Sequence, residues 1–447
     1  MTLTLSSFRP TSGHTSTADQ ASRGPSRRSS GSALRRLAAR TAIVALAGAG
    51  VLAVVVPPAG AVPARPAAEQ AVAVAGSSVT DGAALEAAVR AVVEQGGASA
   101  ALAEVRAGGH SAWKGAAGTA DLDTGEPASA DGRFRIGSIT KTFVATVVLQ
   151  LVAEHRLALD DPIERHLPGV VPNGGAITVR QLLNHTSGIF NYTEDPAFDR
   201  SGDKLHEWLT VGRWRTHHPE QLVALATGHE PYFAPGQGWH YSNTNYVIVG
   251  MLIQRTTGRS WAEEVERRII RPLGLRNTSM PLSSVSVPGP HAHAYFKLPE
   301  GGRADVTMIN PSMFGAAGAG ISSTADLTRF NAALLGGRLL GPAELAEMKR
   351  TVDLGGGAGY GLGLSRTVLP CGEFWGHSGS VPGYGTMLLG NAAGTRQFAG
   401  SANPYDTSDP RATDTAVNQL VVTAVCGPAS TPQPAAKAPT APAVQLP

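Results

Sequence analysis

The sequence predicts an α/β (α+β) domain in which strands from both of its ends form one antiparallel sheet flanked by helices. Strand-like runs occur near the start, at 99–106 and 111–120, and near the end, at 360–365, 373–377, 386–389 and 397–401. Residues 160–337 have mainly helical and loop patterns, which predicts a second, helical lobe. A small-molecule active site is expected in the cleft between the two lobes.

Helical patterns flank these strands. Residues 81–95 have apolar side chains at helical spacing, and residues 413–425 repeat the pattern at the end of the domain. A glycine pair at 108–109 separates the two early strand-like runs and predicts a hairpin. In residues 139–154 apolar side chains cover so much of the helical surface that we expect a buried central helix.

The first 61 residues have the pattern of an export signal. Arginines precede an apolar run at 41–56, and small residues follow at 59–61. A membrane anchor is the alternative, but the run is short for a span and glycine and proline interrupt it. The pattern predicts a cleaved signal peptide and a secreted, extracellular protein. Arginine pairs at 27–28 and 35–36 leave the Sec and twin-arginine routes open.

This leader also carries the positive charge of the chain. The 447 residues have a formal net charge of +3, and residues 1–61 hold seven arginines and one aspartate, which leaves −3 for the rest. No nucleic-acid partner is therefore expected. Residues 62–77 are predicted to be a linker and the Pro/Ala-rich residues 427–447 a disordered tail. The folded domain then spans 78–426.

The chain has two cysteines, Cys371 and Cys426. In an exported protein an isolated pair favours a disulfide, and two buried free thiols are the alternative. A disulfide here would attach the last helix of the domain to the strand region before residue 377.

A Ser-x-x-Lys pattern occurs three times, and context separates the copies. Those at 111–114 and 201–204 fall in the predicted hairpin and in a polar loop, whereas Ser138 opens the buried helix with Lys141 one turn later. Residues i and i+3 share a helix face, so the amine can reach the hydroxyl. A desolvated amine can take the serine proton, and a helix start favours a developing oxyanion. The alternative is an N-capping serine with a surface lysine.

A second motif, Tyr241-Ser242-Asn243, follows a glycine-rich turn. The phenol of Tyr241 can act as a general acid or base, with its pKa lowered by nearby cations, and the amide of Asn243 can hold the lysine and a substrate amide. A capping turn before a helix is the alternative.

A third motif, His377-Ser378-Gly379-Ser380, ends a strand-like run. The glycine lets a substrate backbone lie against the strand, and the hydroxyls of Ser378 and Ser380 can bind a carboxylate. A plain turn between strands is the alternative.

The three motifs, in this order and in these elements, resemble those of the serine DD-peptidases and class C β-lactamases over about residues 80–426. Supporting stretches are residues 134–142, 177–188, 241–246 and 319–324. Among these penicillin-recognising enzymes, the sequence is most similar to the soluble secreted D-alanyl-D-alanine carboxypeptidases. They also have histidine at the first position of the third motif and a cysteine pair.

The resemblance implies a role for each matched residue. Ser138 would be acylated, with Lys141 and Tyr241 handling its proton. The backbone N–H groups of Ser138 and Ser380 would form the oxyanion hole. His377 would support Tyr241 and the leaving group's proton.

Substrate contacts are implied in the same way. Asn243 would hold the acyl amide, and Ser378 and Ser380 would bind the terminal carboxylate. The carboxypeptidases also use an arginine on the preceding strand for that carboxylate, where this sequence has Ser365 followed by Arg366. Class C β-lactamases usually have lysine at the position of the motif histidine, which favours a peptidase.

The implied function is a D-Ala-D-Ala carboxypeptidase that acts on peptidoglycan stem peptides or small peptide and ester substrates and is acylated by β-lactams. A β-lactamase, an esterase or a D-amino-acid peptidase on the same scaffold is the alternative, and a non-catalytic penicillin-binding sensor is less favoured. The protein is expected to be a monomer without a cofactor. His291 and His293 lack further ligands at metal spacing, so no metal is expected. His185 to Gly188 is interpreted as a structural loop.

Overall fold

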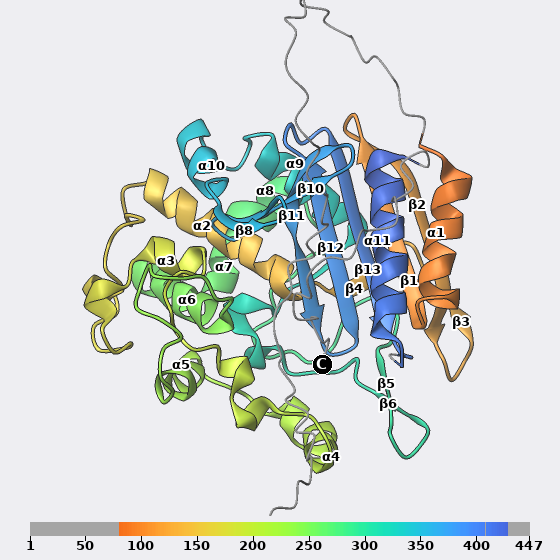
Figure 1. Cartoon of the computed structure of the whole chain (residues 1–447), viewed down its shortest axis with the longest axis horizontal. Helices are drawn as coiled ribbons and strands as arrows, with labels where there is room; N and C mark the ends of the chain where they lie inside the picture. Colours follow the sequence, from red (N-terminus) through yellow and green to blue (C-terminus); the bar gives the residue numbers. More distant parts are fainter. Residues whose placement is uncertain (1–79, 407, 428–447) are drawn as a thin grey trace, which may run out of the picture. The chain divides into compact units, whose positions relative to one another are not determined.

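The computed structural model describes residues 80–406 and 408–427 (Figure 1). The predicted leader at 1–61, the linker at 62–77 and residues 428–447 of the predicted tail lie outside the described residues. Within the described part of the chain, no helix combines the length and apolar character needed to cross a bilayer.

One antiparallel sheet contains the first and the last strands of the described residues. In spatial order its strands are β3 (Glu126–Pro127), β2 (His110–Asp121), β1 (Ala98–Ala107), β13 (Arg396–Pro404), β12 (Tyr384–Asn391), β11 (Gly372–Val381), β10 (Ser365–Leu369), β9 (Ala358–Tyr360) and β8 (Val352–Gly355). The β1–β13 pairing, with Ala103 opposite Gly400, joins the two ends of the domain. The predicted sheet is therefore confirmed. Smaller sheets pair β4 (Arg133–Arg135) with β7 (Ile321–Ser323) and β5 (Tyr295–Lys297) with β6 (Arg303–Asp305).

Helices cover both faces of this sheet. They are α1 (Gly82–Glu94), α2 (Thr140–Ala153), α3 (Val179–Leu183), α4 (Asp203–Thr210), α5 (Pro219–Thr227), α6 (Asn243–Thr257), α7 (Trp261–Val265), α8 (Arg271–Leu273), α9 (Thr324–Leu335), α10 (Pro342–Met348) and α11 (Pro410–Cys426). Helices α1 and α11 pack on one face, against Phe374, Leu389 and Phe398. Helices α2 and α9 lie on the other face, where α3 to α8 continue the core as the helical region (Figure 1).

The buried central helix predicted from the sequence is α2. Nearly all of its side chains are buried, and among them Lys141 carries the ionisable group. Because the helix is buried on every side, the rest of the core packs around it. The helix therefore fixes the position of Lys141 in its first turn.

One strand prediction was wrong. Residues 360–365 do not form a strand: β9 ends at Tyr360, the chain turns, and β10 begins at Ser365. Gly363 has a φ of +69°, and a Cβ there would lie 2.7 Å from the Cβ of Ala145 in α2. The turn packs directly on α2, because the Thr142 hydroxyl donates to the Gly363 carbonyl at 2.8 Å. Glycine is needed for both the backbone angle and the close approach.

Cys371 and Cys426 form a disulfide, with their Cα atoms 5.3 Å apart. It joins the turn before β11 to the last residue of α11, as the sequence predicted. The strand that carries His377 is thus covalently attached to the helix that closes the domain.

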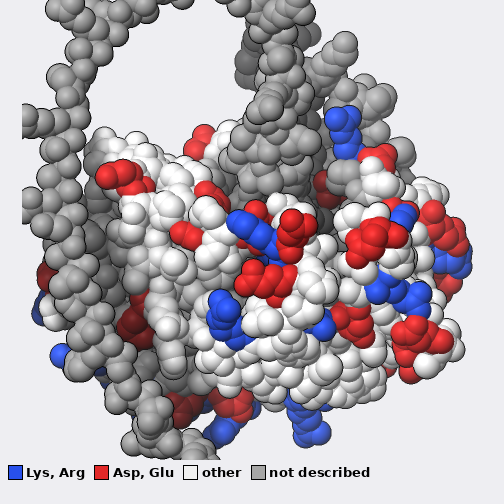
Figure 2. Space-filling model, turned by 90° about the horizontal axis from the view of Figure 1, so that it is seen from below, with Lys and Arg blue, Asp and Glu red and all other residues white. Residues whose placement is uncertain are grey.

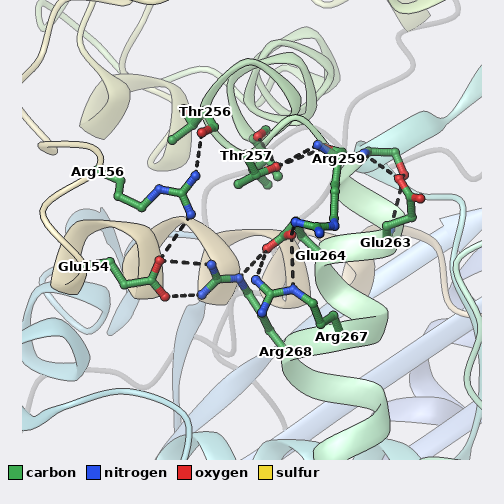
Figure 3. Close-up of polar contacts among 11 residues, drawn as sticks. Glu154, Arg156, Thr256, Thr257, Arg259, Glu263, Glu264, Arg267 and Arg268 are labelled. Atoms are coloured by element: carbon green, nitrogen blue, oxygen red, sulfur yellow. Dashed lines mark hydrogen bonds and ion pairs between the residues drawn. The ribbon is translucent and has the colours of Figure 1, made fainter.

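Ion pairs connect the end of α2 to α7 and the π-helical turn after it (Figure 3). Glu264 is fully buried and contacts the guanidinium groups of Arg267, at 2.8 Å, and of Arg268. Arg268 also binds Glu154 at the end of α2, and Arg156 lies 3.5 Å from the same carboxylate. This group, the Glu264 network, is a buried carboxylate with several cationic partners.

Figure 2 shows Lys and Arg side chains mixed with Asp and Glu on the visible surface of the described residues. Those residues form no extended basic patch of the kind that binds nucleic acid in this view.

Candidate active site

The backbone around Ser138 is pressed against strand β11. Ser138 lies in a 3-10 turn, η1 (Gly137–Ile139), that leads into α2. Gly137 has a φ of +49°, and a Cβ there would lie 2.7 Å from the Ser380 amide nitrogen. A Cβ at Gly379 would lie 2.0 Å from the Ile136 carbonyl oxygen. Only glycine fits at either position, so the strand backbone reaches the nucleophile's own turn. This approach favours the predicted oxyanion hole of Ser138 and Ser380 N–H groups.

Lys141 lies one helical turn after Ser138 and is completely buried. Its Nζ is 3.0 Å from Ser138 Oγ, 2.8 Å from Asn243 Oδ1 and 2.7 Å from the Ala317 carbonyl oxygen. No described carboxylate pairs with it. Burial therefore lowers the pKa of this amine well below its usual value.

The hydrogen-bond partners of Lys141 fit an uncharged amine. The amide oxygen of Asn243 and the carbonyl of Ala317 can only accept, so they take two N–H bonds. A neutral amine has two N–H bonds and one lone pair. The lone pair is then left for the Ser138 hydroxyl, which can donate its proton to it.

Tyr241 lies near both Ser138 and Lys141 and is 5% exposed. Its hydroxyl makes no hydrogen bond of good geometry, although Ser138 is near enough to lower its pKa somewhat. Burial dominates and raises the pKa of Tyr241 above its usual value. The expected lowering by cations was therefore wrong: burial of the phenol raises its pKa, although Lys141 Nζ lies 4.8 Å from the ring centroid. A phenol in this state keeps its proton and acts as a donor.

Asn243 is the first residue of α6 and is fixed on three sides. Its backbone N–H donates to Asn191 Oδ1 at 3.0 Å, and its side-chain Nδ2 donates to Thr193 Oγ1 at 3.3 Å. Because its Oδ1 accepts from Lys141, the side chain has a single orientation. The structure thus brings together the serine, lysine, tyrosine and asparagine predicted from two separate motifs.

His377 lies in the middle of β11, 4% exposed, with Nε2 2.9 Å from the Tyr360 hydroxyl. Burial is the main cause that lowers the pKa of His377, to about 3, so the imidazole is neutral. Ser378 is half-buried and Ser380 exposed along the same strand, while Gly379 is buried.

Arg366 is directed elsewhere. It lies opposite Trp375 in the β10–β11 pair, and its Nη1 is 3.8 Å from the Glu373 carboxylate. None of its described contacts involves Ser138, Lys141 or His377. Its predicted role in binding a substrate carboxylate stays a prediction without a supporting contact.

Three residues of the site have no local signal in the sequence. Tyr360 enters at the end of β9, Ala317 supplies a backbone carbonyl, and Asn191 holds Asn243. Each is brought in by tertiary folding from a distant segment. His185 was interpreted as part of a structural loop, and its φ of +64° fits that interpretation, but its ring also reaches Tyr360.

No cluster of three or more His, Cys, Asp or Glu side chains suited to a metal occurs among the residues the structure describes. His293 instead pairs with Asp305 at 2.8 Å, and His291 bonds to the Gly289 carbonyl at 2.7 Å.

The profile of the family described as Beta-lactamase matches residues 85–422. The chain belongs to this family. Residues 138, 141, 241 and 377 all fall within the matched part. As a beta-lactamase-family protein with this fold, it is a serine hydrolase of the penicillin-recognising superfamily.

Three relatives of this beta-lactamase-family chain differ in activity. Penicillin-binding protein 4* of Bacillus subtilis is 29% identical over 61% of each chain, so the match spans less than two thirds of that relative. Esterase EstB of Burkholderia gladioli is 32% identical over 60% of this chain and 75% of its own. The structure of a D-stereospecific amidohydrolase from Streptomyces sp. is 44% identical, covers 78% of this chain and 99% of its own, and has a TM-score of 0.70.

Proposed function

We propose that the protein is a D-stereospecific serine amidohydrolase, which cleaves the amide or peptide bond on the carbonyl side of a D-amino acid residue. One observation carries the proposal: a similarity of 44% identity extends over 99% of a D-stereospecific amidohydrolase. The Ser138–Lys141–Asn243 hydrogen bonds supply a site able to form an acyl-enzyme.

In the first step, the neutral Lys141 amine takes the proton of the Ser138 hydroxyl as Oγ attacks the substrate carbonyl carbon. The oxyanion is held by the N–H groups of Ser138 and Ser380. The carbon–nitrogen bond then breaks, and the leaving nitrogen takes a proton from the Tyr241 hydroxyl, which becomes a phenolate. Ser138 is left as an ester.

The second step returns the enzyme to its starting state. Between the two steps the Lys141 ammonium passes the proton that it took from Ser138 to the Tyr241 phenolate, so both groups are neutral again. Water then attacks the ester carbonyl and loses a proton to the Lys141 amine, and Ser138 Oγ leaves and takes that proton from Lys141. The products are a D-amino acid or D-aminoacyl carboxylate and an amine.

The predicted D-Ala-D-Ala carboxypeptidase is the second candidate. The half-buried Ser378 and exposed Ser380 on β11 favour it, since their hydroxyls can bind a terminal carboxylate. The contact of Arg366 with Glu373 weighs against it. An amide substrate has no terminal carboxylate and needs no such arginine.

The experiment compares purified protein on D- and L-phenylalanine amide, a peptide ending in D-Ala-D-Ala, and benzylpenicillin. D-amide turnover that exceeds both L-amide and D-Ala-D-Ala turnover supports the proposal. D-Ala release without D-amide turnover would establish the carboxypeptidase, and rapid penicillin loss would establish a β-lactamase. Ser138→Ala should abolish turnover. Ser111→Ala, in the surface copy of the motif, is the matched control and should retain it.

A further inference from the structure

Three buried side chains form a hydrogen-bonded row beside the nucleophile. His185 Nε2 is 3.2 Å from the Tyr360 hydroxyl, and that hydroxyl is 2.9 Å from His377 Nε2. All three residues are at most 4% exposed. They come from three separate segments: the loop after α3, the end of β9 and the middle of β11.

Backbone groups fix the direction of hydrogen bonding at both ends of the row. At one end the Ser242 N–H donates to His185 Nδ1 at 3.2 Å, so Nδ1 carries a lone pair. At the other end His377 Nδ1 contacts the Ser378 carbonyl oxygen, which can only accept. His377 Nδ1 therefore carries a hydrogen.

These ends determine the bonds between them. A neutral His185 with a bare Nδ1 carries its proton on Nε2 and donates it to the Tyr360 oxygen. A neutral His377 with Nδ1–H has a lone pair on Nε2, and Tyr360 can donate to it. Tyr246 lies near the Tyr360 hydroxyl as well. If Tyr360 donated there instead, two lone pairs would face each other at 2.9 Å.

The groups around His377 offer no counter-charge for an imidazolium. Lys141 from α2, Tyr241 from the segment before α6, Tyr360 from β9 and His185 are the titratable groups packed with it. None is a carboxylate.

We propose that His185 and Tyr360 are positioning residues that hold His377 in its Nδ1–H form with both ring nitrogens occupied. His377 then neither gives nor takes a proton in the reaction. This inference rests on the proposed acyl-enzyme function and changes the role that the family resemblance implied for His377. The leaving group's proton comes from Tyr241, whose buried hydroxyl keeps its proton and lies near Ser138.

The test is nitrogen-15 NMR of the imidazoles in the resting full-length protein, with the His377 signals assigned by their loss in His377→Asn. The account predicts a bare Nε2 and a protonated Nδ1, unchanged from pH 5 to pH 9. A protonated Nε2, or an imidazolium in this range, would overturn it. Because this measurement needs no substrate, it stands apart from the test of the proposed function.

A second variant measures the consequence for catalysis. Tyr360→Phe keeps the ring and removes the hydroxyl, so His377 loses its donor and the two neutral tautomers mix. The kcat should fall on the order of tenfold with KM nearly unchanged, as expected for one lost hydrogen bond. Tyr384→Phe, at the first residue of β12, is the matched control, since the buried Tyr384 hydroxyl donates to the Ala292 carbonyl at 3.0 Å. Unchanged tautomers and kcat in Tyr360→Phe would contradict the proposal.

Discussion

Lys141 and Glu264 are both completely buried, but only Glu264 has partners of opposite charge. Lys141 is surrounded by carbonyl oxygens, a hydroxyl and aromatic rings, without an acidic partner, and the pKa of its amine is lowered. Glu264 lies between arginines (Figure 3), and although burial alone would raise its pKa, the hydrogen bonds of Arg267 and Arg268 lower it. Burial without a counter-charge favours the neutral group, and burial among counter-charges keeps the charge. The first arrangement leaves Lys141 able to act as a base, and the second attaches helix α2 to helix α7.

Removing the Lys141 amine should have the largest effect. In Lys141→Met the Ser138 hydroxyl has no base, and kcat/KM should fall on the order of a thousandfold. Lys114→Met is the matched control, because Lys114 ends the copy of the motif in β2 and pairs at the surface with Asp131. If the two variants had similar kcat/KM values, the buried copy of the motif would not be the catalytic one.

Glu264→Gln should produce the largest loss of stability. It leaves the guanidinium groups of Arg267 and Arg268 without their buried partner, which should cost about 3 kcal/mol of unfolding free energy. Calorimetry measures this as a lower Tm. Glu266→Gln is the control: it removes the partner of Arg271 in an ion pair that is more exposed than the Glu264 network. This change should cost less than about 1 kcal/mol of unfolding free energy. If the two variants had the same Tm, the buried Glu264 network would contribute no more to stability than an exposed ion pair.

Stability should rise with pH at both residues, because both have a lowered pKa, but in different pH ranges. Lys141 has a lowered pKa, so it is neutral when folded and charged when unfolded, and folding becomes more favourable as the pH rises toward 10.5. The Tm of the wild type, measured relative to that of Lys141→Met, should therefore rise between pH 7 and pH 10. Glu264 contributes stability above its usual pKa of 4.5, which is lost as the pH falls through its lowered value. A constant Tm difference between wild type and Lys141→Met would indicate a charged amine.

Arg366→Gln should have the smallest effect. Its half-buried guanidinium contacts Glu373 at 3.8 Å, so D-amide turnover should change less than about threefold. A selective loss of more than tenfold on substrates with a free terminal carboxylate would mean that Arg366 turns into the site. That outcome would favour the carboxypeptidase.

The sequence predicted the site where chemistry and secondary structure coincide within one segment. Ser138 and Lys141 share one helix face, and Tyr241 with Asn243 lies at the start of another helix, so local spacing was enough to find them. The sheet followed from strand-like runs at both ends of the domain. The helical region between the two groups of strands was likewise visible in the change of periodicity along the chain.

Other features depend on contacts between distant segments, which periodicity does not contain. The turn after Tyr360 looked like a strand because apolar residues alternate there, but glycines and the surface of α2 bend it. The raised pKa of Tyr241 follows from burial by several segments together. The same is true of the row that links His185 to His377 through Tyr360.

The central claim is that Lys141 is a neutral amine in the resting enzyme. Carbon-13 NMR of the lysine Cε groups, with Lys141 assigned by its loss in Lys141→Met, follows this titration directly. The account predicts a midpoint well below the usual 10.5. A midpoint at or above that value would contradict it, because a charged Lys141 has no lone pair to accept the Ser138 proton.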